Sequence, residues 1–185
     1  KISLVLAILR SALGAPGVPP ASVITALAAV LSMFVMAPVG AEIAGALEAA
    51  NLTAMAGKDA FGFGEVRALF ETASPPLMDF LRLNTPASET QFFSSLAGAL
   101  PDAQPGFRIL LPAFAVGEVV EAFLIGFLVF IPFLVIDLIV ANTLLALGMH
   151  MMSPTAVSLP LKLLLFVAVD GWHILLSGLL VNYAM

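Results

Sequence analysis

The sequence predicts an all-α, membrane-associated protein in which apolar helical hairpins flank a more polar helical insert. Of its 185 residues, 61% are hydrophobic and 10% are charged, whereas soluble domains are about 45–50% apolar and about 25% charged. The mean hydropathy is +1.11, and so few charges cannot cover a water-exposed surface. Apolar residues recur at helical spacing and no strand-like alternation stands out, which favours helices throughout.

The distribution of charge divides the chain into three segments. Residues 11–41 have no ionisable side chain, residues 40–108 hold eight acids and four bases, and residues 122–169 have only Asp137, His150 and Lys162. We therefore predict N-terminal apolar helices over residues 1–39, a helical hydrophilic insert over residues 40–108, and a C-terminal helical hairpin over residues 109–185.

The first apolar segment predicts two helices. Residues 2–13 form a short helix that ends at Gly14, since glycine commonly ends helices. The Pro- and Gly-rich residues 14–20 form a turn. A second helix is expected to run to about Ala37, before Pro38, and its roughly 18 residues are just long enough to cross a bilayer core.

The insert is also predicted to be helical. Apolar spacing indicates three helices, over residues 40–56, 65–73 and 75–83. Thr85 and Pro86 suit the N-cap and first turn of a fourth helix that includes Leu96. Residues 101–106 are a linker.

The C-terminal region contains one long apolar pattern over residues 111–149, interrupted by Pro112 and Pro132. As a straight helix it would extend roughly 58 Å, nearly twice a ~30 Å hydrocarbon core. Either Pro132 kinks or breaks this helix, or part of it is buried in protein. A turn at residues 148–154 and a return helix over residues 156–183 complete an antiparallel hairpin.

Four acids lie in or beside this hairpin: Glu118, Glu121, Asp137 and Asp170. Glu118 and Glu121 share one helix face because they are three residues apart. Ionisable residues within a membrane are candidates for functional roles such as proton relays. The alternative, which we favour, is structural: the acids pair with the backbone, with Lys162 or with another subunit.

The hairpin tip consists of Met149, His150, Met151 and Met152. Methionine is unbranched and adaptable, so several at a tip can close a deformable seal, or can merely fill a tight turn. We favour a functional role for this cluster.

Several classes of function are not expected. The chain has two histidines and no cysteine, so we expect no metal site, and we expect no cofactor. No nucleophile elbow or phosphate loop is present, so we expect no enzyme. The net charge of −5 without a basic patch argues against nucleic acid as a partner.

Ordered motifs at both ends of the chain resemble one known family. The C-terminal motifs are Leu111-Pro-Ala-Phe114, Ala122-Phe-Leu-Ile-Gly-Phe127, Ile131-Pro-Phe-Leu-Val-Ile-Asp-Leu138, Leu147-Gly-Met-His-Met-Met-Ser-Pro154, Ser158-Leu-Pro-Leu-Lys-Leu-Leu-Leu-Phe166 and Val169-Asp-Gly-Trp172. The N-terminal motifs are Arg10-Ser-Ala-Leu-Gly14, Val18-Pro-Pro20 and Phe34-Val-Met-Ala-Pro38. Together they are similar to the FliP/SctR family, the export-gate subunit of type III secretion systems and flagella.

This resemblance implies a bacterial inner-membrane protein, partly projecting into the periplasm, that is not an enzyme. Family members form a pentameric ring, join SctS/FliQ-type and SctT/FliR-type subunits, and conduct unfolded secreted proteins. The insert over residues 40–108 would then be extracytoplasmic.

The resemblance also assigns a role to the tip. Met149, Met151 and Met152 would line the gasket that seals the pore around a passing chain. His150 departs from the family's methionine run and would make the seal more polar or pH-sensitive. Ser153 followed by Pro154 is closer to virulence-type than to flagellar members.

Two other functions stay open. The first is a small proton-coupled membrane transporter that uses Glu118, Glu121 and Asp137. The second is an interaction scaffold with no conduit. Loss of transport with intact assembly after neutralising the acids would favour the transporter.

Overall fold

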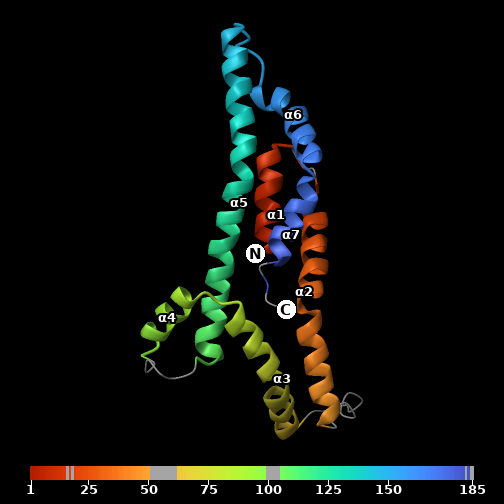
Figure 1. The fold of residues 1–185 in the computed structure, drawn as a ribbon, viewed down its shortest axis with the longest axis vertical. Helices are drawn as coiled ribbons and strands as arrows, with labels where there is room; N and C mark the ends of the chain where they lie inside the picture. The colour runs from red at the N-terminus through yellow and green to blue at the C-terminus, as the bar shows by residue number, and fades with distance from the viewer. Residues whose placement is uncertain (16, 18, 51–61, 99–104, 182, 184–185) are drawn as a thin grey trace. The chain divides into compact units, whose positions relative to one another are not determined.

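The computed structural model describes residues 1–15, 17, 19–50, 62–98, 105–181 and 183. Over these residues the regular structure is entirely α-helical, which confirms the predicted fold class. The helices, shown in Figure 1, are α1 (Ile2–Leu13), α2 (Ala21–Ala49), α3 (Phe63–Leu83), α4 (Ala87–Leu96), α5 (Phe107–Ala146), α6 (Pro154–Ala168) and α7 (Gly171–Val181).

The chain forms two compact units, and two of the three boundaries between them lie within helices. The first unit comprises Lys1–Ser32 and Val119–Asn182, and the second comprises Met33–Glu118 together with the C-terminal Tyr183–Met185. Both α2 and α5 therefore contribute to each unit. The three-part division that charge suggests thus differs from the division made by packing.

In the first unit, α1 is the central helix, alongside α5 and α6 (Figure 1). Its buried residues recur at helical spacing: Ile2, Val5, Leu6, Leu9, Ala12 and Leu13. Full burial of a large aliphatic side chain is worth about 1.5–3 kcal/mol, so this face anchors α1 strongly. At Gly126 of α5, a Cβ atom would collide with the side chain of Ile8, so glycine permits the close approach of the two helices.

In the second unit, aromatic rings join α3 to the start of α5. The Phe80 ring packs edge-on against Phe114 and stacks on Tyr183, at centroid distances of 6.0 and 6.4 Å. At Gly117 a Cβ atom would lie 2.7 Å from the Cδ of Pro86, so the residue that precedes α4 packs directly on the α5 backbone.

Prolines do not end helices where the sequence suggests. We expected the second helix to stop near Ala37, but α2 continues through Pro38 to Ala49. A proline interrupts the helical hydrogen-bond ladder by one bond, and membrane helices tolerate this because neighbouring groups satisfy the freed carbonyl. The predicted helix over residues 40–56 is thus partly the end of α2, and residues 51–56 lie outside the described part.

The insert shows the same correction. The two helices predicted over residues 65–73 and 75–83 are one helix, α3, with Pro75 and Pro76 in its interior. The fourth helix begins one residue later than expected. Pro86 is its N-cap, and the Thr85 hydroxyl donates instead to the Leu81 carbonyl at 2.5 Å. Residues 101–104 of the predicted linker lie outside the described residues.

The C-terminal hairpin differs from expectation in its second arm. α5 is a single helix of 40 residues that continues through both of its prolines. The return arm, expected as one helix over residues 156–183, is instead two helices, α6 and α7, bent by 62°. The bend lies at Asp170, the one non-glycine residue with positive φ among those described (φ 52°).

Length and apolar composition allow two helices, α2 and α5, to cross a membrane. The bent pair α6–α7 would be a third crossing if it forms one broken span. The structure thus agrees with a membrane protein.

Candidate functional site

The methionine tip follows a well-defined helix end. The Met149 N–H donates to the Leu144 carbonyl at 2.9 Å, and the Gly148 N–H donates to Leu145 at 3.0 Å. These two bonds, with Gly148 at φ 73°, form a Schellman motif that ends α5 and satisfies its last carbonyls. Ser153 is the N-cap of α6, and Pro154 occupies its first turn, where a missing N–H costs nothing. The tip is thus a short turn held at both ends.

Within the protomer, the methionine side chains of this turn are exposed. Met151 is 99% exposed, and Met149 and Met152 are each 45% exposed. His150 is also exposed. The alternative in which these methionines fill the core of a tight turn is therefore not what the protomer shows.

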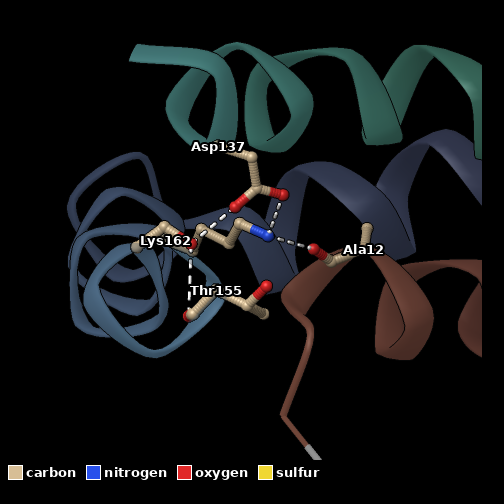
Figure 2. A network of polar contacts seen from close by, with 5 residues as sticks. Ala12, Asp137, Thr155 and Lys162 are labelled. Carbon is tan, nitrogen blue, oxygen red and sulfur yellow. Dashed lines mark hydrogen bonds and ion pairs between the residues drawn. The ribbon is translucent and has the colours of Figure 1, made fainter. Parts of the chain in front are cut away.

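A polar network at the other predicted site joins three helices (Figure 2). Lys162 of α6 is 2% exposed, and its Nζ donates to Asp137 Oδ2 of α5 at 2.7 Å and to the Ala12 carbonyl of α1 at 3.0 Å. Ser158, one turn before Lys162 and fully buried, donates to Asp137 Oδ1 at 2.5 Å. Each carboxylate oxygen of Asp137 therefore accepts one bond, and an end carbonyl of α1 gains a donor.

Two other acids bind local partners. Glu121 Oε2 forms an ion pair with Lys1 Nζ at 2.9 Å, and the Lys1 side chain is 1% exposed. Glu118 is buried and accepts a hydrogen bond from the Tyr183 hydroxyl. Although these acids are three residues apart, they bind different partners.

Asp170 occupies the bend between α6 and α7 and is exposed in the protomer. Its carbonyl accepts the Ile174 N–H at 3.2 Å, so it provides the first carbonyl of α7. At Gly171 a Cβ atom would collide with the Phe166 ring, and Trp172 packs edge-on against the same ring at 5.3 Å. Asp170 thus provides the bend between the two helices in the protomer, and an inter-subunit role for its carboxylate stays a prediction.

The structure adds residues that we did not single out from the sequence. Ser158 and Tyr183 complete the partners of Asp137 and Glu118. A signal existed for Ser158, because it is four residues before Lys162 and therefore shares its helix face. No signal pointed to Tyr183, whose contact depends on the tertiary fold. In the described residues, no three His, Asp or Glu side chains lie close enough together to hold a metal ion.

Comparison with known proteins extends over nearly the whole chain. Residues 1–179 match the sequence profile of the FliP family. The flagellar biosynthetic protein FliP of Cereibacter sphaeroides is 46% identical over 99% of this chain and 59% of its own length. The hypersensitivity response secretion protein HrcR of Ralstonia nicotianae is 42% identical, and the Yop proteins translocation protein R of Yersinia pestis is 41% identical. Each covers 99% of this chain, which spans 86% and 85% of their lengths.

The matched region includes the Lys162 network, the methionine tip and the α6–α7 bend. A family profile that spans residues 1–179, with relatives above 40% identity, is sufficient to assign the family. This chain belongs to the FliP family.

Proposed function

We propose that this chain is a core subunit of the type III secretion export gate. In this role it forms a conduit for unfolded proteins across the bacterial inner membrane, and its methionine tip is a gasket that seals the pore. The names of its relatives, which refer to flagellar biosynthesis, secretion and translocation, support this role.

The observation that carries the proposal is the exposure of three methionines at one turn. Met151 is 99% exposed although its thioether side chain is apolar. An apolar cluster held out at the end of a long hairpin is expected to be covered in the working assembly. Flexible thioethers suit a seal, because they can fill gaps of changing shape around a passing polypeptide.

The exposed surface of α5 also supports assembly with other subunits. Large apolar side chains are exposed near both ends of this helix, at Leu111 (50%) and Leu145 (58%). These residues are 34 positions apart, which is about 50 Å along an α-helix, whereas a hydrocarbon core is about 30 Å thick. A hydrocarbon core of that thickness covers only part of this length, which favours protein neighbours for the remainder.

We propose that copies of this chain supply part of that cover, as a pentameric ring joined by SctS/FliQ-type and SctT/FliR-type subunits. The insert would face the periplasm, and the assembly would project from the inner membrane. Ser153 and Pro154 after the methionines favour the virulence type of this machine.

The proton-coupled transporter is not favoured by the site geometry. Glu118, Glu121 and Asp137 bind Tyr183, Lys1 and Lys162 respectively. A proton relay needs groups that pass a proton from one to the next, and these acids form separate local pairs.

Replacing Met149, Met151 and Met152 with alanine tests the gasket. We expect the variant to assemble and to make the membrane leak ions, measured with a potential-sensitive dye in secreting cells. Met33→Ala is the matched control, because Met33 is 74% exposed on α2 but lies outside the tip. An ion-tight membrane in the triple variant, with the subunit at normal abundance, would refute the gasket.

A further inference from the structure

Two hollows in the first unit share one residue, Arg10. The first, of about 280 Å³, has an almost wholly apolar lining from α1, α2 and α7 that includes Leu6, Leu13, Val23 and Trp172. The second, of about 320 Å³, is more polar and is lined by Ser11, Gly14 and Gly17. Arg10 lines both hollows, so its cationic side chain lies between an apolar cavity and a more polar one.

Arg10 has no anionic partner in the described part of the chain. The two other bases of this unit, Lys1 and Lys162, are paired with Glu121 and Asp137. No ion pair or hydrogen bond engages the Arg10 guanidinium among the described residues. Its position in the last turn of α1 is favourable for the helix dipole, but five N–H donors remain to be satisfied. Because Arg10 is partly buried at the edge of an apolar cavity, an external anion would be a favourable partner in place of water.

The surroundings of Arg10 are those of a membrane–water interface. The backbone turns at Gly14 and Gly17, both with positive φ, and such non-helical backbone is not stable against lipid hydrocarbon. Trp172, 43% exposed beside the apolar cavity, is the residue type that concentrates at headgroup depth.

The lining of the apolar cavity favours an aliphatic occupant such as an acyl chain, because almost every group that faces the space is apolar. The walls are also pre-formed, because the end of α1 is held by the bond from Lys162 to the Ala12 carbonyl.

We propose that this site binds an anionic phospholipid. Arg10 binds the lipid phosphate in the polar hollow, and one acyl chain lies in the apolar cavity between α1, α2 and α7. Basic pockets between membrane helices bind anionic headgroups by the same physics. The proposal does not depend on the methionine gasket.

The test uses the full-length protein in the assembly extracted from bacterial membranes in mild detergent. After delipidation, dioleoylphosphatidylglycerol or dioleoylphosphatidylcholine is added back, and native mass spectrometry counts the lipid retained per protomer. We expect phosphatidylglycerol to be retained at about one per protomer and phosphatidylcholine at least fivefold less.

Substitutions separate the headgroup from the tail. Arg10→Gln should lower phosphatidylglycerol retention at least fivefold, and Arg10→Lys should keep most of it. Arg108→Gln is the matched control, because it removes an exposed arginine from α5 outside the site. Val23→Trp, which places a large ring in the apolar cavity, should lower retention without any change of charge.

Three results would overturn the proposal. The first is unchanged retention in Arg10→Gln, or an equal loss in Arg108→Gln. The second is stabilisation of the delipidated assembly by inorganic phosphate alone to the same extent as by phosphatidylglycerol. The third is capture of a neighbouring protein subunit, rather than lipid, by a photo-crosslinking residue at position 23.

Discussion

Lys162 is a buried cation whose partners come from two other helices. It binds a carboxylate of α5 and an end carbonyl of α1, and the same carboxylate is bound by Ser158. A charge taken out of water costs several kcal/mol, and the pairing must offset that cost. The network therefore specifies which faces of α1, α5 and α6 meet.

Replacing Lys162 with methionine should lower the free energy of unfolding by about 3 kcal/mol, because it leaves Asp137 without a cation and Ala12 without a donor. Asp137→Asn should cost at least as much, because it leaves Lys162, which is 2% exposed, buried with only neutral acceptors. The measurement is the thermal unfolding midpoint in one fixed detergent.

The exposed pair Arg67–Glu71 provides a matched control for this prediction. Its side chains are 71% and 61% exposed, so Arg67→Met should cost less than about 1 kcal/mol. The double variant Asp137→Leu with Lys162→Met should recover part of the loss, since it leaves no unpaired charge. Equal effects of Lys162→Met and Arg67→Met would contradict the role of the buried network.

At the scale of the helix, Gly171 sets the packing of the α6–α7 bend. A methyl group there would collide with the rigid Phe166 ring, whereas nothing lies within 4 Å of a Cβ placed at Gly178 of the same helix. Gly171→Ala should therefore destabilise the assembly and reduce secretion, and Gly178→Ala should be neutral or stabilising by up to about 1 kcal/mol. Equal thermal midpoints of the two variants would show that the bend does not depend on this contact.

Helix type was predictable from the sequence, but several helix boundaries were not. Apolar periodicity and Gly14 predicted α1 at its observed bounds. Pro38, Pro75 and Pro76 suggested helix ends that do not occur, since the helices continue through all three. The local sequence shows only that a proline removes one backbone hydrogen bond. Tertiary packing and the surrounding solvent decide whether the helix continues.

At Asp170 the prediction failed in the opposite way, because the structure has a helix break that we did not predict. No proline lies there, so we expected one continuous return helix. The signal that we did not use is the dipeptide Asp170-Gly171, since Asp-Gly favours turns and aspartate adopts positive φ more readily than most non-glycine residues. The close fit of Gly171 against Phe166 depends on residues brought together by that bend. Among the candidate site residues, the pairing of Asp137 with Lys162 was one of the alternatives we drew from charge alone, because Lys162 is the only base after Arg108.

At the scale of the whole molecule, α5 exposes apolar side chains over a length that exceeds the thickness of a bilayer's hydrocarbon core. Exposed aliphatic residues occur from Leu111 to Leu145 of α5, over about 50 Å of helix. The methionine tip follows directly after this helix. A protomer of this kind is expected to be stable only within an assembly, and its tip is expected to meet the tips of other copies.

A single introduced thiol at the tip tests this arrangement. Residues 1–185 contain no cysteine, so Met151→Cys gives one reactive site in this region. If the tips converge in a ring, a short bismaleimide should join two copies, and the product should stop at the dimer when the introduced thiol is the only one in each copy. Met33→Cys is the control, because Met33 is 74% exposed on α2 and distant in sequence from the tip, and it should give much less dimer. A ring of five must also leave at least one copy unjoined, which gel densitometry of the exhaustively treated assembly can detect. Equal dimer yields from the two variants, or none from Met151→Cys, would place the methionines away from a common axis and would remove the basis for the gasket.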